Sequence, residues 1–527
     1  MPKFALPRCY DAAELSELLG SSWAVQVDSR HTQRLIMYDT FDWRLYRQSL
    51  GFWGVEETYT LYDLGVQKVV TTAVMPEPPV YVWDLPHGLL RARLDPLIGV
   101  RALLPQADVL VQTIVNQVLD TAAQPVAKLV MEEIRPSDRH APQSPTAYLV
   151  VEALPGQVDA VAQIARQLQQ AGLAASETAR YEDMLTAAGQ TPGDYSAKLD
   201  INLTPDMRAD EATKAILRYL LQVMRTNEVY IRQDLDPEFL HDYRVAVRRT
   251  RSALSQIKAV FPPATISRFK HEFKVLGKLS NHLRDLDVYL QAEEDYKNQL
   301  PDFLREAIEP LFDYLRTRRT QALHEVSEGL NSDDYQQMVA DWEAFLTEDE
   351  GETAVSPPPV TNAATPILIL ARRRIYKRYQ QVIAAGQTIL TQNQLGQMHS
   401  LRIECKKLRY LMEFFASLFP PKEMGILIRQ LKQLQTHLGD LNDLNVQQTY
   451  LLHVADDLPL RRKKNRRALV AIGWLIANLE QKKTQAKAES AAAFTQFASH
   501  ENARLFAQLF APLPETTLST GPLTTEA

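Results

Sequence analysis

A stretch of basic residues occurs twice in this chain, and the two copies lie 158 residues apart. The first reads His241-Asp-Tyr-Arg-Val-Ala-Val-Arg-Arg-Thr-Arg251, and the second reads His399-Ser-Leu-Arg-Ile-Glu-Cys-Lys-Lys-Leu-Arg409. The same offset, without a gap, aligns Phe261-Pro-Pro with Phe419-Pro-Pro, Lys274 with Lys432, and Leu283-Arg-Asp-Leu-Asp-Val288 with Leu441-Asn-Asp-Leu-Asn-Val446. Because a gapless repeat also repeats its core-forming positions, it predicts two structurally equivalent halves.

Each copy has the periodicity of a helix with one cationic face. At about 100° per residue, the first, fourth, eighth and eleventh positions fall within an arc of about 80°. In both copies these positions hold a histidine followed by three Lys or Arg residues, and the opposite arc is mostly apolar, with Glu404 as the exception. This pattern is typical of an amphipathic helix that packs on a core, so each half is expected to present one cationic stripe.

Composition bounds the class of protein. The chain has 527 residues, of which 45% are hydrophobic and 23% are charged, so it is expected to be globular with two to four domains. The net charge is −6, but Lys and Arg cluster in a few helical segments. Two cysteines, Cys9 and Cys405, provide neither a disulfide framework nor a zinc site. No signal peptide and no apolar run of about 18 residues is evident, so we expect a cytoplasmic protein without a membrane partner.

Residues 1–190 have the pattern of an α+β domain built on antiparallel strands. Strands are predicted at Trp23–Val27, Gln33–Tyr38, Val69–Val74, Ala127–Glu133 and Ala147–Glu152, and helices at Asp11–Leu19 and Ala160–Gly172. Residues 191–205 are expected to be a linker.

The rest of the chain has a helical pattern almost throughout. A helix is predicted at Glu211–Gln233, and Asp236-Pro-Glu then supplies an N-cap and a first-turn proline for the stripe helix. We expect a first helical bundle at 206–346, an acidic, proline-rich linker at 347–364, a second bundle at 365–512 and a disordered tail at 513–527.

The charge of the first half favours an anion site. Ten Lys or Arg residues and two acids lie between His241 and Arg284, a balance of +8 over one helical hairpin. Such a basic run is usually a solvated helix face, but its duplication in the same angular register favours binding. Arg can contact phosphate oxygens in pairs and Lys supplies a mobile point charge, so the two stripes suit a flexible chain of phosphates.

The doubled motif, the two Leu-x-Asp-Leu-x-Val segments and the all-helical context resemble the conserved-histidine α-helical domain, CHAD, over residues 205–512. The resemblance implies two four-helix bundles related by a pseudo-twofold axis, with the stripes lining a shared cavity that binds inorganic polyphosphate. The candidate polyphosphate-binding residues are His241, Arg244, Arg248, Arg249, Arg251, Lys274, His399, Arg402, Lys406, Lys407, Arg409 and Lys432.

The N-terminal third resembles the CYTH domain of the triphosphate tunnel metalloenzymes. The resemblance rests on Tyr38-Asp-Thr-Phe-Asp-Trp-Arg-Leu-Tyr46, Arg101-Ala-Leu-Leu-Pro, a strand ending at Glu152, and Arg180-Tyr181. It implies an eight-stranded antiparallel barrel whose tunnel holds a triphosphate and a divalent metal. The Glu-x-Glu-x-Lys signature is missing, however, since only Met1-Pro2 precede Lys3-Phe4. Too few carboxylates remain for Mg²⁺ or Mn²⁺, so a catalytically empty barrel is expected.

The sequence therefore favours a polyphosphate-binding protein with no catalytic residues, metal ligands or cofactor. Two alternatives stay open, a metal-dependent triphosphatase and a nucleic-acid-binding module, although few aromatic residues lie beside the stripes to stack on bases. Polyphosphate granules and polyphosphate-metabolising enzymes are further candidate partners. Asp285 and Asp443 are expected to orient stripe cations by ion pairing. The basic segments Arg372–Arg378 and Arg461–Arg467 either extend the anion surface or are solvated helix.

Overall fold

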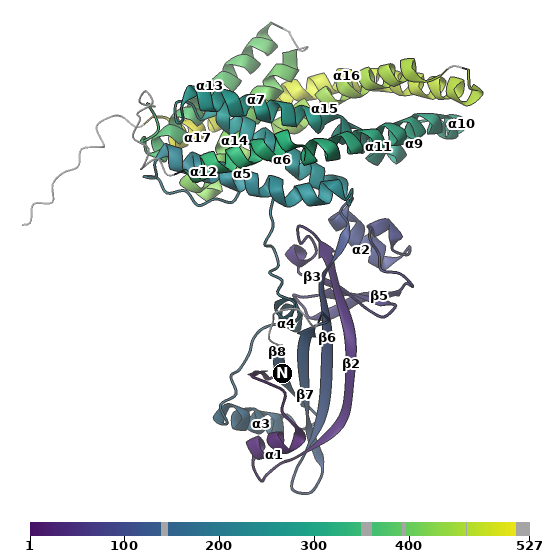
Figure 1. The fold of residues 1–527 in the computed structure, drawn as a ribbon, viewed down its shortest axis with the longest axis vertical. Coiled ribbons are helices and arrows are strands. Elements are labelled where there is room, and N and C mark those ends of the chain that lie inside the picture. The colour runs from purple at the N-terminus through teal and green to yellow at the C-terminus, as the bar shows by residue number, and fades with distance from the viewer. Residues whose placement is uncertain (139–145, 349–360, 393–396, 460, 513–527) are drawn as a thin grey trace, which may run out of the picture. The chain divides into compact units, whose positions relative to one another are not determined.

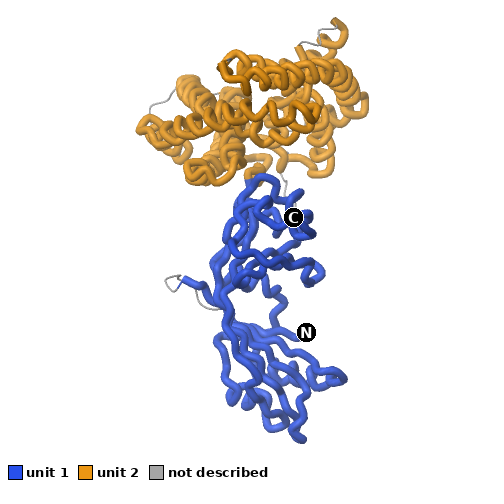
Figure 2. Tube along the Cα trace, turned by 90° about the vertical axis from the view of Figure 1, so that its right-hand side faces the viewer, with its two compact units in different colours: residues 1–196 blue, residues 197–527 orange. Residues whose placement is uncertain are grey.

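A computed structural model describes residues 1–138, 146–348, 361–392, 397–459 and 461–512. The chain divides into two compact units, Met1–Ser196 and Ala197–Ala527 (Figure 2). Most of the acidic linker, at 349–360, and the whole predicted tail, at 513–527, lie outside the described residues. In the part of the chain that is described, no helix is long and apolar enough to cross a bilayer.

Unit 1 is built on one antiparallel sheet of eight strands (Figure 1). The strands are β1 (Lys3–Leu6), β2 (Ala24–Thr40), β3 (Leu50–Val55), β4 (Thr58–Asp63), β5 (Lys68–Val74), β6 (Leu103–Leu119), β7 (Pro125–Pro136) and β8 (Thr146–Ala153). Their order across the sheet is β1-β8-β7-β6-β2-β3-β4-β5. The predicted α+β class is confirmed, and the antiparallel sheet is compatible with a CYTH-like barrel.

Two long strands form the middle of this sheet. The strands expected at Trp23–Val27 and Gln33–Tyr38 are parts of the single strand β2, so the predicted break between them is wrong. The polar residues between them contain no Gly or Pro to end a strand, and β2 pairs with β6 throughout, across register shifts at Val27/Ser29 and Met37/Tyr38. Strand β6 was not predicted, although its buried and partly buried residues largely alternate from Ala107 onward.

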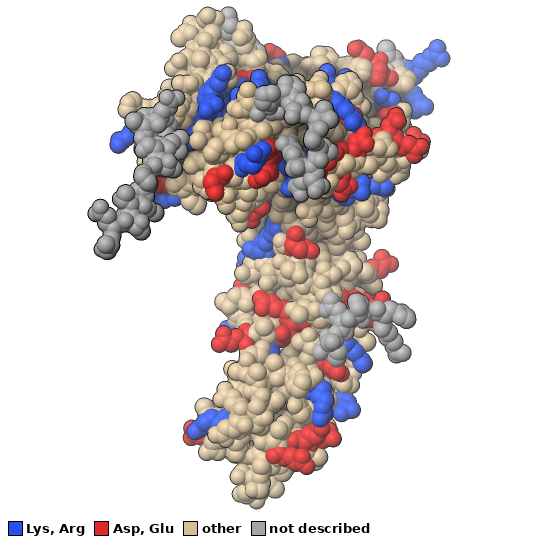
Figure 3. Space-filling model, turned by 60° about the vertical axis from the view of Figure 1, so that its left-hand side comes forward, with Lys and Arg blue, Asp and Glu red and all other residues tan. Residues whose placement is uncertain are grey.

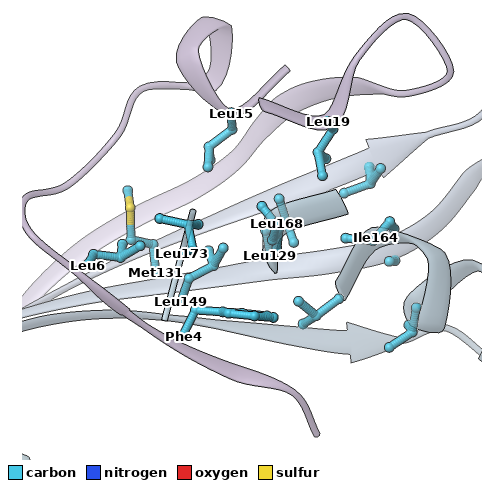
Figure 4. Packing of buried hydrophobic residues seen from close by; sticks show 14 of the residues in the cluster. Phe4, Leu6, Leu15, Leu19, Leu129, Met131, Leu149, Ile164, Leu168 and Leu173 are labelled. Atoms are coloured by element: carbon cyan, nitrogen blue, oxygen red, sulfur yellow. The ribbon is translucent and has the colours of Figure 1, made fainter. Parts of the chain in front are cut away.

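Helices cover the sheet of unit 1, and the apolar core lies between these helices and the strands. Helices α1 (Ala12–Leu19) and α3 (Val158–Gln170) pack their apolar faces on β7 and β8, and Figure 4 shows Leu15, Leu19, Ile164 and Leu168 converging on Leu129 and Leu149. Helix α2 (Leu89–Ile98) and helix α4 (Arg180–Ala187) contribute to two further apolar clusters.

Unit 2 is helical (Figure 1), and its helices divide into two halves that correspond to the two copies of the sequence repeat. The first half contains α5 (Ala209–Arg232), α6 (Pro237–Gln256), α7 (Pro263–Leu279), α8 (Asn281–Gln291), α9 (Glu293–Asn298), α10 (Asp302–Arg305), α11 (Glu309–Asn331) and α12 (Asp333–Thr347). The second half contains α13 (Ile367–Thr391), α14 (Met398–Phe414), α15 (Pro421–Asp457), α16 (Lys463–Phe497) and α17 (His500–Phe510). The continuous helix α15 corresponds to α7 and α8, which are separated at Ser280.

Backbone hydrogen bonds show how the two halves are related. Ile367 N donates to Met207 O over 2.8 Å, and Ala209 N donates to Thr365 O over 3.0 Å. Met207 and Thr365 are 158 residues apart, as are Ala209 and Ile367, so each bond is the repeat equivalent of the other. This reciprocal pairing is that of a local twofold axis, and it places the start of α5 beside the start of α13.

Candidate functional site

On the face drawn in Figure 3, basic and acidic side chains are interspersed, so the charge on this face does not locate a site. Lys and Arg alternate with Asp and Glu there over both units.

The two stripe helices, α6 and α14, pack against each other in unit 2. Asp236 caps α6 by accepting a hydrogen bond from Glu238 N at 2.9 Å, with Pro237 at the first helical position. At the contact between the helices, Arg249 Nη2 lies 3.0 Å from a Glu413 carboxylate oxygen. Gln256 Nε2 donates to Lys407 O over 3.1 Å. The fold thus brings together the two copies of the basic motif.

Arg248 on α6 and Lys406 on α14 are repeat equivalents, and in the packed structure their positive charges repel each other. Burial lowers the pKa of the Lys406 ammonium to about 8, with further lowering by Arg402 and Arg248. Burial likewise lowers the pKa of Arg244 to about 10, again with a contribution from Arg248. Both effects are those expected when like charges are held together in a partly desolvated position.

Polar groups of the neighbouring helices orient the innermost arginines. Arg244 Nη1 donates to Ser280 Oγ at 3.0 Å and to Asn281 Oδ1 at 2.9 Å. Arg402 Nη2 lies 3.6 Å from the Asp443 carboxylate, while Arg402 Nε is buried without a hydrogen-bond partner in the described residues. Arg402 therefore retains an unused donor.

Asp285 and Asp443 lie on the same side as the stripes. Asp285 raises the pKa of Arg244 and so partly offsets the repulsion among the cations. Nearby, the rings of Tyr289 on α8 and Tyr450 on α15 stack with centroids 4.3 Å apart. This stack joins the two halves beside the stripes. It was not predicted, because the two tyrosines are not repeat equivalents.

The remaining stripe residues lie along the same helix faces. His241 is half-buried on α6, and His399 is exposed on α14, where its Nδ1 contacts Asn442 Oδ1. Arg251 approaches Gly277 on α7, and Arg409 lies 3.5 Å from Glu413. Lys274 and Lys432 are exposed. Lys274 lies one helical turn before Gly277, which Arg251 approaches, whereas Lys432 lies about two turns before Gly439, which Arg402 approaches.

Two of the predicted site residues lie off the stripes. Arg249 binds Glu413 and donates to Ala197 O at 2.8 Å. Its repeat equivalent, Lys407, lies 2.6 Å from Glu404. Both residues lie about 140° around the helix from the fourth motif position, which places them outside the arc of the stripe. Both cations already have protein partners.

The two basic segments of unit 2, Arg372–Arg378 and Arg461–Arg467, differ in their contacts. Arg461, Arg462, Lys463 and Lys464 are exposed, and Lys464 lies 3.7 Å from Asp313. In the segment Arg372–Arg378, Arg372 donates to Ala511 O, while Arg374, Lys377 and Arg378 line a pocket.

In unit 1, the groups expected near a tunnel are paired with one another. Arg180 donates to both carboxylate oxygens of Glu132, at 2.6 and 3.0 Å, and Tyr148 also donates to this carboxylate. Burial raises the pKa of Glu132, but Arg180, Tyr148 and Thr113 together lower it by more, so the net shift is downward. Lys3 pairs with Asp183. Within the described ranges, no group of three or more His, Cys, Asp or Glu residues is placed to hold a metal ion.

Comparison with known proteins gives a match in the helical unit. Residues 215–452 match the family model described as CHAD domain. A crystal structure of the CHAD domain from the plant Ricinus communis aligns with 24% identity and a TM-score of 0.45, covering 56% of this chain and 95% of that chain. PptA from Streptomyces chartreusis aligns with 15% identity and a TM-score of 0.42, covering 55% and 100%. No curated protein matches the chain.

Proposed function

The chain carries a CHAD domain over residues 215–452, and we propose that this domain binds inorganic polyphosphate along the two stripes of α6 and α14. The role is one of binding, and the ligand is a single extended polyanion that touches both halves. In a cell, such a protein is expected in the cytoplasm at polyphosphate granules or with polyphosphate-metabolising enzymes.

The observation that carries the proposal is the packing of α6 against α14, which brings the two basic stripes together. Burial lowers the pKa of Lys406, and Arg402 of the same half and Arg248 of the other half lower it further. Holding like charges in a partly desolvated position costs free energy in the absence of a ligand. A polyanion lying along the stripes removes this cost, because each added negative charge favours the protonated ammonium.

The geometry also fits a polymer of phosphates. Arg244 and Arg402 are held in place by neighbouring side chains, so less rotamer entropy is lost when they bind phosphate oxygens. Lys406 supplies a mobile charge between them. The rings of Tyr289 and Tyr450 beside the stripes stack on each other, so these faces are not free to stack on bases, which disfavours single-stranded nucleic acid as the ligand.

The direct test replaces Arg244, Arg248, Arg402 and Lys406 together by Ala and measures polyphosphate binding by titration calorimetry. Binding should be lost while the helical circular dichroism signal is retained, since all four residues lie outside the apolar core. Wild-type affinity should fall steeply with salt, because bound cations release counterions. Full affinity in the folded quadruple variant would refute the proposal.

A matched control removes four cations from the exposed segment Arg461–Lys464. Its affinity should stay within about threefold of wild type, because these residues do not border the stripes. An equal loss in the control would mean that overall charge, rather than the stripe geometry, drives binding.

A double-mutant cycle tests whether both halves share one ligand. Replacing Arg248 and Lys406 by Met singly and together should give non-additive losses of affinity for a long chain, and the loss should be smaller for a short chain. Additive losses with two ligands bound per monomer would show that the halves bind separately.

We propose further that unit 1 is not a triphosphatase. The carboxylate of Glu132, one of the few acids available for metal in the CYTH-like sheet, is committed to Arg180 and Tyr148. The full-length protein should therefore release no phosphate from tripolyphosphate or ATP in the presence of Mg²⁺ or Mn²⁺. Metal-dependent release that persists in a Glu132→Gln variant would place a catalytic site elsewhere, and release abolished by it would assign Glu132 to catalysis. Either result contradicts this proposal.

A further inference from the structure

A small basic pocket lies where the C-terminal end of α6 meets α13 and α14. It encloses about 130 Å³. The lining residues are Gln256, Lys258, Arg374, Lys377, Arg378, Gln381 and Leu411. Four of these are Lys or Arg, and three of those four belong to the segment Arg372–Arg378, for which the proposed function gives no role.

The pocket contains cationic groups that the protein itself does not use. Arg374 Nε is buried without a hydrogen-bond partner in the described residues, although Nη2 of the same side chain donates to Lys258 O at 3.0 Å. Lys258 and Lys377 are exposed, and neither ammonium forms an ion pair within the described ranges. A buried donor without an acceptor is destabilising, and an oxyanion would satisfy it.

One carboxylate at this pocket, that of Glu404, is shared by two cations. Arg378 lies 2.5 Å from a Glu404 carboxylate oxygen, and Lys407 shares the same carboxylate at 2.6 Å. Burial lowers the pKa of Arg374, and Arg373 and Arg378 lower it further. The pocket therefore has an excess of positive charge, and burial together with the neighbouring arginines disfavours the charged form of Arg374.

The internal repeat shows that packing alone does not require these cations. The equivalents of Arg374, Lys377 and Arg378 in the first half are Ile216, Tyr219 and Leu220. Ile216 and Leu220 are 0% and 1% exposed, so apolar side chains fill the same helix face of α5. The corresponding face of α13 is basic, which indicates that these cations bind a ligand and are not required for helix packing.

We propose that this pocket binds one phosphate group, either as free orthophosphate or as the terminal group of a phosphate chain. The pocket, of about 130 Å³, has room for a tetrahedral oxyanion. Arg374 Nε and the two lysine ammoniums supply the donors. The Gln256 amide oxygen, also buried without a partner, can accept from a lysine or from a protonated phosphate oxygen.

This site is distinct from the stripes. Leu411, on the wall of the pocket, lies about 180° around α14 from Arg402, so the helix itself separates the two positions. The inference goes beyond the proposed function, because it holds or fails whether or not the stripes bind polyphosphate.

The test compares orthophosphate binding to the full-length protein and its variants by calorimetry and ³¹P line broadening at low salt. In Lys258→Met/Lys377→Met, affinity should fall at least tenfold. Both side chains are exposed and unpaired, so the fold should be unaffected. Arg373→Met is the matched control, since this exposed cation neighbours Arg374 without lining the pocket, and its affinity should change less than twofold.

A stripe variant, Arg248→Met/Lys406→Met, separates this inference from the proposed function. It should lose polyphosphate affinity and keep the pocket's orthophosphate binding. The inference is overturned if wild type binds no orthophosphate, if the pocket variant binds it as tightly as wild type, or if only the stripe variant loses it.

A competition experiment then identifies the source of the phosphate group. Linear tripolyphosphate has terminal groups and cyclic trimetaphosphate has none. Displacement of orthophosphate by the linear compound alone would show that chain ends enter the pocket. Displacement by neither would assign the site to free orthophosphate, and displacement by the cyclic compound as effectively as by the linear one would contradict a single-group site.

Discussion

Replacing Lys406 by Met should stabilise the ligand-free protein while it weakens polyphosphate binding. A fall in the Lys406 pKa from 10.5 to about 8 corresponds to at most about 3.4 kcal/mol, at about 1.4 kcal/mol for each tenfold change in proton affinity. Because the side chain is only half-buried, water screens part of this cost, and we expect a gain of about 1–2 kcal/mol in the free energy of unfolding at pH 7. Methionine keeps the length of the side chain and removes the charge.

The pH dependence of this gain identifies its cause. The folded state favours the neutral amine, so the cost of the charged Lys406 is fully present below about pH 8 and disappears as the pH rises towards 10.5. Urea unfolding followed by circular dichroism at pH 7 and at pH 10.5 measures this difference between wild type and variant. Lys432→Met, at an exposed position on α15, is the control and should change stability by less than about 0.5 kcal/mol.

Added polyphosphate should reverse the order of stabilities. At one hundred times the dissociation constant, a ligand that binds only the folded state stabilises it by about 2.7 kcal/mol, and the variant should lose most of this increment. A variant that is less stable than wild type at pH 7 without ligand, or whose gain persists unchanged at pH 10.5, would refute the reasoning about Lys406.

Two further predictions concern pH and packing. Polyphosphate affinity should decrease as the pH rises above about 8, because the anion favours protonated Lys406, and titration calorimetry should show a weaker dependence in Lys406→Arg. Gly386→Ala should lower the free energy of unfolding by about 2 kcal/mol, because its Cβ would overlap the Phe494 ring. Gly473→Ala, in an open helical position of α16, should raise it by about 0.5–1 kcal/mol; equal effects of the two alanines in urea unfolding would contradict this account of the packing.

The strands of unit 1 show where sequence patterns succeed and where they fail. Hydrophobic runs correctly placed strands within β5, β7 and β8. The polar middle of β2 has a low propensity for strand formation, but its pairing with β6 keeps it extended. Backbone hydrogen bonds to a neighbouring strand override a weak local preference. Local patterns do not contain that neighbour, so the predicted ends of β2 were wrong.

The sequence by itself determined the helical stripes, their phase and the equivalence of the two halves, because a helix face is fixed by spacing along one chain. Only the tertiary structure decided which of these cations meet. It placed Arg248 beside Lys406, committed Arg249 and Lys407 to carboxylates, and brought Lys258 to Arg374 from 116 residues away. The physical reason is that charge repulsion, desolvation and enclosure depend on distances between helices, which the periodicity of a single helix does not specify.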